Sequence, residues 1–349
     1  MRAIVYTQTG DASVLQLVDR LLPTPGPGEV RVRIIVSGVN PTDWKVRRGT
    51  GTAAGIGTAA ADAPESVPNQ DGAGIIDAVG AGVTTHAVGD RVWLVVAAWQ
   101  RPGSGTAQEF TIAPIERVFP LPIEAGFDLG ASLGVPAITA HRALTVAEDG
   151  PSRLHPGALT GRTVLVAGGA GAVGHAAIQL ARWAGATVIT TVSNPSKAAL
   201  ATAAGAHHVV TYTDADAAAQ IRALAPAGVD QVVEVAGSAN QPLNLAVVRP
   251  GATIAMYAND GGTPFTIDVR PSMQLNLRYQ FVLLYTIGFD TITAAAEDVN
   301  AAIRDGALPI GEDAGLPLHR FTLEQTATAH DAVEGGIVGK VLIDVGSEA

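Results

Sequence analysis

The fold is decided by one stretch of sequence, TVLVAGGAGAVG, which occupies residues 163–174. Residues 163–167 form a short apolar run with β-branched side chains, a pattern that predicts a buried strand. Gly169, Gly171 and Gly174 then satisfy the spacing G-x-G-x-x-G, and a second register runs through Gly168. A helical stripe of apolar residues follows, and the next strand is predicted from Thr187. The stretch therefore opens a β–α–β unit.

The glycine-rich turn has a chemistry that follows from its place between a strand and a helix. Residues without side chains let a pyrophosphate approach the backbone, and the helix N-terminus offers N–H donors and the positive end of its dipole. We therefore predict a dinucleotide site made by the whole turn: Gly168, Gly169, Ala170, Gly171, Ala172, Val173 and Gly174. The alternative is a tight turn that binds no ligand.

The end of the second strand predicts which dinucleotide is bound. NAD sites usually carry Asp or Glu there, which bonds the ribose 2′-hydroxyl. Here the chain reads SNPSK over residues 193–197, with no acid and with a lysine. Hydroxyl and ammonium groups attract a 2′-phosphate that a carboxylate would repel. We therefore predict NADPH, with Ser193 and Lys197 beside the phosphate; a solvated lysine at a helix start is the alternative for Lys197.

Strands and helices continue to alternate along the second half of the chain. Strands are predicted at residues 187–192, 209–211, 231–235 and 253–257, with helical patterns between them. This alternation predicts an α/β fold with a doubly wound parallel sheet. A last helix and strand are predicted at 292–305 and 341–345.

The first third of the chain is β-rich. Residues 30–36 alternate apolar and polar side chains after a Pro/Gly turn, and further strands are predicted at 75–79 and 91–96. Between these strands, residues 49–63 consist almost entirely of Gly, Ala and Thr, which predicts a mobile surface loop. The alternative is that this segment is an insertion without a specific role.

The amino-acid composition excludes several classes of protein and of functional site. The 349 residues are 47% hydrophobic and 15% charged, which excludes a disordered chain, and the net charge of −10 argues against nucleic acid as a partner. Cysteine is absent, so disulfides, a thiolate nucleophile and Cys-ligated zinc are impossible. No apolar run reaches the roughly 18 residues of a membrane span. We expect a cytoplasmic protein without a membrane or nucleic-acid partner.

Several separated motifs resemble those of one family when they are taken in order along the chain. They are ASLGVPAITA at 131–140, the glycine-rich turn, AHDAVEGG at 329–336 and GKV at 339–341. Over essentially its whole length the chain is similar to the medium-chain dehydrogenase/reductase superfamily, in its zinc-free quinone oxidoreductase (ζ-crystallin-like) branch. The resemblance implies a GroES-like β-rich catalytic domain over 1–130 and 295–349, and a Rossmann NADPH-binding domain over 131–294.

The resemblance also implies a site without a metal. Asn40, in the segment SGVNPTD, stands where zinc alcohol dehydrogenases have a catalytic cysteine, and Gln70 stands where they have a histidine ligand. The expected metal content is none. Asn40 is the expected catalytic residue, either as a hydrogen-bond donor to the substrate carbonyl or as a support for the nicotinamide ribose. No side chain is assigned as a proton donor.

Further positions match residues of the family that bind the cofactor. Lys197 and Tyr212 match the lysine and tyrosine that clasp the 2′-phosphate, and Thr139 matches a threonine at the entrance of the nicotinamide pocket. Such folds line that pocket with the ends of later strands, which here carry Val235, Ala236, Gly237, Met256 and Tyr257.

Together these features predict an NADPH-dependent, zinc-independent reductase that transfers hydride to a quinone or an α,β-unsaturated carbonyl compound. The alternatives are a zinc-free alcohol/aldehyde or enoyl reductase of the same superfamily, and a non-catalytic NADPH-binding protein. The resemblance also places an edge strand of the Rossmann sheet at the apolar run 280–285, and relatives pair this strand across a two-fold axis, so a homodimer is expected.

Overall fold

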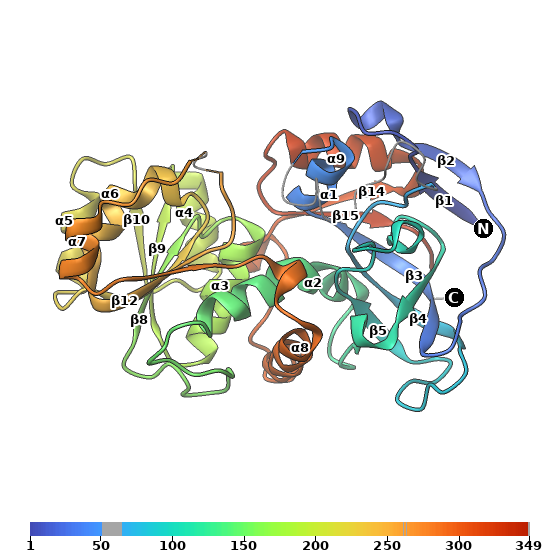
Figure 1. Ribbon diagram of the computed structural model, residues 1–349, viewed down its shortest axis with the longest axis horizontal. Coiled ribbons are helices and arrows are strands. Elements are labelled where there is room, and N and C mark those ends of the chain that lie inside the picture. The colour runs from blue at the N-terminus through green and yellow to red at the C-terminus, as the bar shows by residue number, and fades with distance from the viewer. Residues whose placement is uncertain (51–64, 261, 263, 348–349) are drawn as a thin grey trace. The chain divides into compact units, whose positions relative to one another are not determined.

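The computed structural model describes residues 1–50, 65–260, 262 and 264–347. The chain forms two compact units, Met1–Val135 with Leu318–Ala349, and Pro136–Pro317. Both ends of the chain belong to the first unit (Figure 1). From residue 51 onward, the Gly/Ala-rich segment predicted as a mobile loop lies outside the described residues.

The unit boundaries differ from the domain boundaries of 130 and 295 implied by the resemblance. Residue 295 lies inside helix α8 (Phe289–Arg304), and Asp298 of this helix is bound to the second unit. A 2.8 Å hydrogen bond joins Asp298 Oδ2 to His141 Nε2, and the backbone N–H of Leu154 donates to the same oxygen at 2.7 Å. These buried contacts hold α8 in the second unit, which therefore extends to Pro317.

The first unit is built on a seven-stranded sheet of order β14-β15-β3-β4-β5-β7, with β6 paired to β3. Its central strand β3 contains the alternating segment predicted at 30–36, and Val30, Val32 and Ile34 are fully buried as the alternation requires. β1 and β2 form a separate antiparallel pair. The strands are β1 (Arg2–Val5), β2 (Gln16–Asp19), β3 (Glu29–Val39), β4 (Asp71–Val79), β5 (Arg91–Leu94), β6 (Phe110–Pro114), β7 (Val118–Pro120), β14 (Leu318–Thr322) and β15 (Lys340–Asp344).

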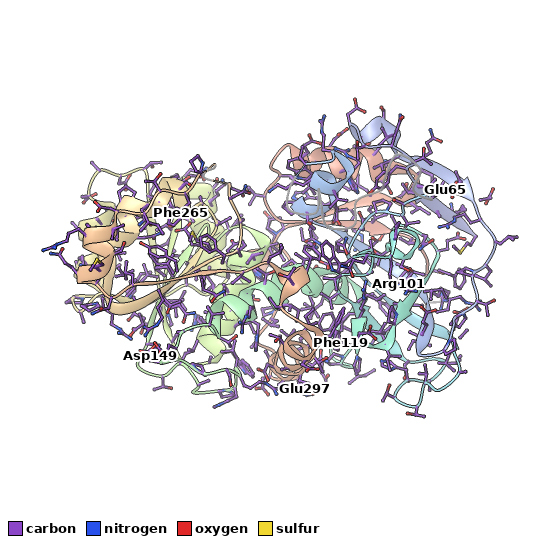
Figure 2. The ribbon with its side chains drawn as sticks, viewed as in Figure 1. Glu65, Arg101, Phe119, Asp149, Phe265 and Glu297 are labelled. Carbon is purple, nitrogen blue, oxygen red and sulfur yellow. The ribbon has the colours of Figure 1, made fainter. Side chains whose placement is uncertain are left out.

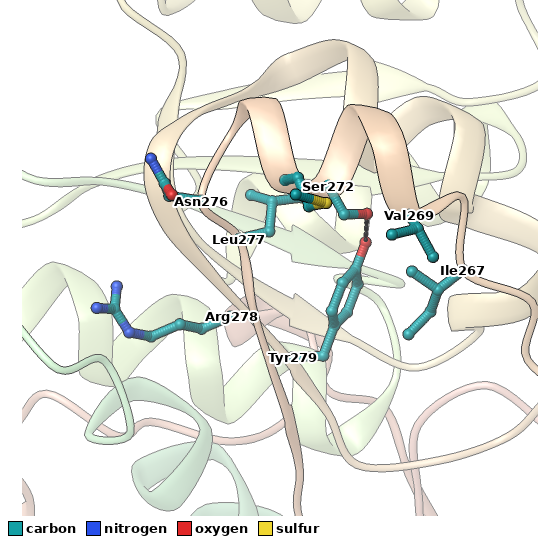
Figure 3. Close-up of a pocket in the computed structure, with 8 residues that line it drawn as sticks. Ile267, Val269, Ser272, Asn276, Leu277, Arg278 and Tyr279 are labelled. Carbon is teal, nitrogen blue, oxygen red and sulfur yellow. Dashed lines mark hydrogen bonds between the residues drawn. The ribbon is translucent and has the colours of Figure 1, made fainter.

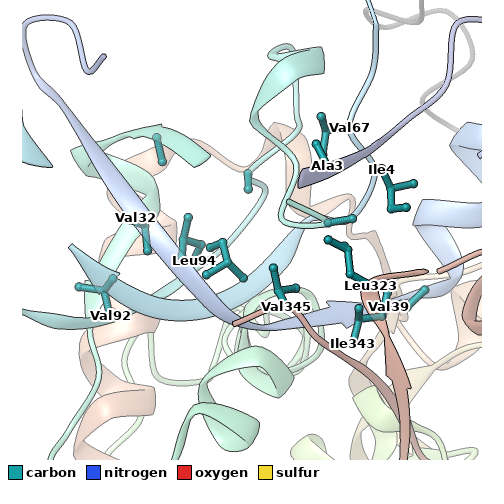
Figure 4. Close-up of a cluster of buried hydrophobic side chains, with 14 of the residues drawn as sticks. Ala3, Ile4, Val32, Val39, Val67, Val92, Leu94, Leu323, Ile343 and Val345 are labelled. Carbon is teal, nitrogen blue, oxygen red and sulfur yellow. The ribbon is translucent and has the colours of Figure 1, made fainter. Parts of the chain in front are cut away.

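One apolar core joins the early and late strands of this unit. Val32 of β3, Val92 and Leu94 of β5 and Ile343 of β15 belong to a single cluster of buried side chains (Figure 4). Trp93, between Val92 and Leu94 in the sequence, is fully buried and packs against Phe119 with ring centroids 5.0 Å apart. Phe119 is labelled in Figure 2. The last strand is therefore an integral part of the first unit. Its helices are α1 (Pro41–Arg47) and α9 (Thr326–Glu334), and α2 (Phe127–Leu144) spans the boundary at 135.

The second unit is the predicted doubly wound parallel sheet, with strand order β10-β9-β8-β11-β12-β13. The chain runs outward from β8 to β10 and then crosses to β11, so the winding direction changes between β8 and β11. The strands are β8 (Thr163–Ala167), β9 (Thr187–Val192), β10 (His208–Thr211), β11 (Val229–Glu234), β12 (Val248–Met256) and β13 (Arg278–Phe281). Besides α8, the helices are α3 (Ala172–Trp183), α4 (Pro195–Ala203), α5 (Ala217–Leu224), α6 (Gly237–Val247) and α7 (Val269–Gln274) (Figure 1).

The edge strand β13 ends sooner than the apolar run 280–285 predicts. It stops at Phe281, and a 3₁₀ turn follows at Leu284–Thr286. Val282 is buried and its backbone N–H still donates to the carbonyl oxygen of Met256 at 2.7 Å, and Leu284, in the 3₁₀ turn, is buried too. None of the helices formed by the described residues is both long enough and apolar enough to cross a membrane.

Candidate functional site

The glycine-rich turn lies where the winding direction of the parallel sheet changes. It connects β8 to α3, and a Cβ placed on Gly168 would lie 3.3 Å from the side chain of Val235, which follows β11. Doubly wound sheets bind their ligands at the carboxyl ends of the strands at this switch point. The turn and the segment after β11 therefore occupy the position expected of a cofactor site.

Three of the four glycines in the turn are required by the folded structure and not by a ligand. Gly168 has a φ of +72°, in the left-handed region that favours glycine. A Cβ on Gly169 would lie 2.1 Å from Thr190 Oγ1, and one on Gly174 would lie 2.3 Å from the carbonyl oxygen of Gly168. These two residues let the turn and helix α3 pack directly against their neighbours.

Gly171 differs from the other three glycines. A Cβ there would have its nearest contact at 3.4 Å, from the carbonyl oxygen of Gly168, and the φ of −81° suits any residue. Gly171 is also the N-cap of α3, whose first-turn N–H groups need acceptors from outside the helix. The bare backbone at Gly171 therefore leaves space for a ligand rather than for another part of the chain, and this space suits the pyrophosphate of a dinucleotide.

The residues assigned to the 2′-phosphate gather at the ends of two adjacent strands. Ser193 follows β9, Lys197 lies in the first turn of α4, and Tyr212 follows β10. β9 and β10 are parallel, with Val192 opposite Thr211, so their carboxyl ends share one edge of the sheet. Asn194 caps α4 by accepting a hydrogen bond from the backbone N–H of Lys197 at 2.9 Å. The lysine is thus placed at the N-terminus of a helix, where an anion is favoured.

The positions expected to line the nicotinamide pocket also lie at this edge. Val235 and Ala236 follow β11, Met256 ends β12, and Tyr257 comes directly after it. Gly237 begins α6, and a Cβ there would lie 2.4 Å from the sulfur of Met256, so the ends of β11 and β12 are in close contact. Thr139 is a buried residue of α2.

Glu234, which sequence reasoning missed, organises the segment after β11. Its carboxylate is fully buried and accepts hydrogen bonds from the backbone of Ala236 at 2.7 Å and from the side chains of Asn240 and Asn244 at 2.8 and 2.7 Å. Burial, followed by the charge of Glu234, raises the pKa of Tyr257. The tyrosine hydroxyl therefore stays protonated.

Asn40 lies in a buried polar cluster of the first unit. Its side-chain N–H donates to Asp71 Oδ2 at 2.7 Å, and its Oδ1 accepts from Lys340 Nζ at 2.8 Å. Its backbone N–H donates to Asp43 Oδ2 at 2.7 Å, at the start of α1. The four residues are each no more than 3% exposed. The sequence singled out Asn40 but not these partners.

Burial perturbs the ionisation of the three charged members of the cluster. It raises the pKa of Asp43 to about 8, with a further contribution from the nearby carboxylate of Asp71. It also raises the pKa of Asp71, against the opposing effect of Lys340, and lowers the pKa of Lys340, against the pull of the two carboxylates. Two carboxyl groups and one ammonium are thus enclosed together, as is common at functional sites.

Strained backbone surrounds this cluster. Asn69, directly before Gln70, has a φ of +76°, and the β-branched, buried Val96 has a φ of +50°. Gln70 connects the two strained segments, because its side-chain oxygen accepts from the backbone N–H of Ala98 at 3.1 Å. Such conformations cost of order 1–3 kcal/mol each and concentrate at functional sites.

The residues at the zinc-ligand positions do not suit a zinc ion. Gln70 and Asn40 carry neutral amides, and both side chains are already hydrogen-bonded, to Ala98 and to the Asp71–Lys340 pair. Catalytic zinc takes three protein ligands drawn from Cys, His, Asp and Glu. Within residues 1–50, 65–260, 262 and 264–347, no three such side chains gather closely enough to hold a metal ion.

A β-rich unit completed by the C-terminal strand, together with a parallel-sheet unit carrying a glycine-rich turn, defines the class of two-domain dehydrogenases and reductases. Comparison with known protein families supports this class. The profile for the alcohol dehydrogenase GroES-like domain matches residues 26–123, and the profile for the zinc-binding dehydrogenase matches residues 172–301.

Individual proteins match over most or nearly all of the chain. Quinone oxidoreductase of Rattus norvegicus is 30% identical over 349 residues, covering 98% of this chain and 97% of that protein. The 2-haloacrylate reductase of a Burkholderia species is 31% identical over 273 residues, covering 77% of this chain and 76% of that protein. A solved mycobacterial protein in complex with NADPH is 29% identical, with a TM-score of 0.80 over 98% of this chain and 99% of that one. A solved mycobacterial quinone oxidoreductase is 28% identical, with a TM-score of 0.81 over 98% of this chain and 99% of that one. The chain belongs to the medium-chain dehydrogenase/reductase superfamily, in its quinone oxidoreductase branch.

Proposed function

We propose that the protein is an NADPH-dependent reductase that transfers hydride to a quinone or an α,β-unsaturated carbonyl compound without the help of zinc. The observation that carries the proposal is the pair of neutral, hydrogen-bonded amides, Asn40 and Gln70, at the positions where zinc would be held. A site without a Lewis acid favours substrates that are already electron-poor. The names of the rat quinone oxidoreductase and the 2-haloacrylate reductase point to acceptors of this kind.

The second unit supplies the groups that would hold the cofactor. The N-terminus of α3 and the open backbone at Gly171 suit the pyrophosphate, and Ser193, Lys197 and Tyr212 suit the 2′-phosphate. The ends of β11 and β12, from Val235 to Gly237 and at Met256–Tyr257, suit the nicotinamide end. We assign Thr139, a buried residue of α2, to the same end by its match to the family. When bound, NADPH supplies the hydride, and the protein contributes position and the exclusion of water.

The first unit supplies the group that would meet the substrate. Asp71 takes one of the two amide hydrogens of Asn40, and we assign the second to the substrate carbonyl oxygen. Negative charge grows on this oxygen as hydride arrives, so a fixed donor stabilises the transition state more than the bound substrate.

Steady-state oxidation of NADPH tests the proposal. The purified protein is assayed with a 1,4-quinone, an enone, a simple aldehyde and a primary alcohol, before and after dialysis against a chelator. We expect turnover of the quinone or the enone, little with the aldehyde, none of the alcohol with NADP⁺, and no change after dialysis. Loss of activity on chelation would refute zinc independence, and NADPH binding without turnover of any acceptor would favour a non-catalytic protein.

We further propose that the protein is a homodimer paired through β13. This strand is the last in the sheet order, and an exposed apolar edge invites pairing with another chain. Phe281 at its end and Met273 and Val269 on α7 are each more than 60% exposed. Val269 and Met273 line an open pocket of about 520 Å³ in which the hydroxyls of Ser272 and Tyr279 lie 3.1 Å apart (Figure 3).

Sedimentation separates a dimer from a monomer. We expect twice the chain mass for the wild type and the chain mass for Phe281→Asp combined with Met273→Asp. Leu21→Asp is the matched control, because Leu21 is an exposed apolar residue of the other unit, at 94% exposure. A wild-type monomer at micromolar concentration would refute the dimer. The cytoplasmic location and the absence of a nucleic-acid partner stay predictions.

A further inference from the structure

Lys340 is a buried lysine for which the proposed reaction has so far given no role. It begins β15, is 1% exposed, and is one of only three lysines in the chain. Its Nζ lies 2.8 Å from Asn40 Oδ1 and 3.4 Å from Asp71 Oδ2. A buried ammonium of this kind is costly unless it is paired, so its place beside the Asn40 amide requires a reason.

Lys340, Asp71 and Asn40 form a closed triangle of polar contacts. The amide N–H of Asn40 donates to Asp71 Oδ2 at 2.7 Å, and this same oxygen faces Lys340. Rotating the amide by half a turn would place its NH₂ against the ammonium and its oxygen against the carboxylate. Both contacts would be repulsive, so the two charged groups allow one orientation of the Asn40 side chain.

The surrounding backbone holds the two charged groups in place. Asp71 Oδ1 accepts from the backbone N–H of Val135 at 2.8 Å. A Cβ on Gly134 would lie 2.2 Å from this oxygen, and a Cβ on Gly38 would lie 3.1 Å from Lys340 Nζ. The lack of side chains at these two glycines lets the charged groups reach Asn40. Replacing a buried ion pair with apolar residues is often neutral or stabilising, so stability alone does not account for this arrangement.

We propose that Lys340 and Asp71 are positioning residues that fix the amide of Asn40, so that its second N–H is presented in a single direction. The ammonium at the amide oxygen also polarises the amide, which strengthens that N–H as a donor. Both residues act through Asn40. The inference rests on the role of Asn40 in the proposed function.

A double-mutant cycle on kcat tests whether Lys340 acts through Asn40. We expect Lys340→Met to lower kcat by about tenfold or more, as for loss of an oriented donor, while KM for NADPH changes less than about threefold. In the Asn40→Ala background the same change should have almost no further effect on kcat, because the group being positioned is gone. If the fold-losses in kcat of the two single variants multiply in the double variant, the proposal is wrong.

Two further variants separate positioning from folding. Asp71→Asn combined with Lys340→Met removes both charges together, and we expect it to fold while kcat stays low; recovery of kcat would overturn the proposal. Arg47→Met is the matched control, since Arg47 is another fully buried cation of the same unit, paired with Glu334. It should lower the melting temperature and leave kcat within about twofold.

A crystal structure of Lys340→Met distinguishes this proposal from the proposed function. We expect the Asn40 amide to turn or to occupy two orientations once the ammonium is gone. An unchanged, single orientation would overturn the positioning role whatever the enzyme reduces. A wild-type protein that reduces no quinone or enone would refute the proposed function and leave the crystal structure as the test of positioning.

Discussion

Gly171→Ala should separate ligand binding from folding at the glycine-rich turn. The added methyl would meet only the carbonyl oxygen of Gly168, at 3.4 Å, and the backbone at φ −81° accepts alanine. Alanine restricts the unfolded chain, which stabilises the fold by about 0.4–1 kcal/mol, but it is a poorer N-cap than glycine by a similar amount. The melting temperature should therefore change by less than about 2 °C.

The same methyl would occupy the space that we assign to the pyrophosphate. We expect NADPH to bind at least about tenfold more weakly, a loss of about 1.4 kcal/mol. Titration of cofactor fluorescence measures the affinity, and a thermal melt without cofactor measures the stability. Wild-type affinity in Gly171→Ala would refute the assignment of this space to the cofactor.

Gly174→Ala is the matched control, in which we expect a loss of stability even without cofactor. Its methyl would lie 2.3 Å from the carbonyl oxygen of Gly168 and 2.9 Å from the Cα of Gly169, both backbone atoms. Overpacking of this kind costs about 1–3 kcal/mol, so the melting temperature should fall by several degrees even without cofactor. An unshifted melt would show that the turn relaxes more easily than its packing implies.

Three further predictions follow from the site. Lys197→Ala with Tyr212→Phe should raise KM for NADPH by about tenfold or more and leave KM for NADH nearly unchanged, because the lost contacts involve only the 2′-phosphate; a parallel loss with both cofactors would contradict this. Asn40→Ala should lower kcat by about tenfold to a thousandfold in stopped-flow or steady-state assays while NADPH still binds. An unchanged kcat would show that Asn40 has no role in catalysis. Burial lowers the pKa of His175 to about 4 and that of His330 to about 3, so the unfolded chain takes up protons between pH 6.5 and these values and the folded chain does not. Stability should therefore fall on acidification by about 2 kcal/mol per histidine at pH 5, and denaturant melts of His175→Gln and His330→Gln should show a weaker pH dependence.

The parts of the fold that depend on neighbouring residues could be predicted from the sequence. β8 and β9 have the predicted bounds, because each is a β-branched apolar run flanked by turn-forming residues: Gly161 and Gly168 around β8, and Gly185 and the segment SNP at 193–195 around β9. The end of β13 could not be predicted, because the apolar pattern continues through Leu284, which is buried in a 3₁₀ turn and not in a strand. The place of α8 depends on the contact of Asp298 with His141, which is 157 residues away in the chain.

The candidate site also could be predicted only where its residues are neighbours in the sequence. The glycine-rich turn is contiguous, so its spacing is visible in the sequence. The partners of Asn40 are not, since Asp71 and Lys340 are 31 and 300 residues away. A lysine at the start of a strand is usually solvated. Its one unusual feature is that it follows Gly339 and leads directly into the apolar run 341–343.

The separation of Asp71 from Lys340 along the chain has a consequence for synthesis of the protein. During translation, 269 residues must be added after Asp71 before its ammonium partner exists, which takes about 10 to 50 s at roughly 5–20 residues per second. Until then, β3 lacks its neighbour β15, and two carboxyl groups lack the cation that accompanies them on burial. The parallel-sheet unit is complete at Pro317 and can fold on the ribosome first. The unit that is started first is therefore finished last, and the β15 side of β3 stays unpaired until the last strand is made.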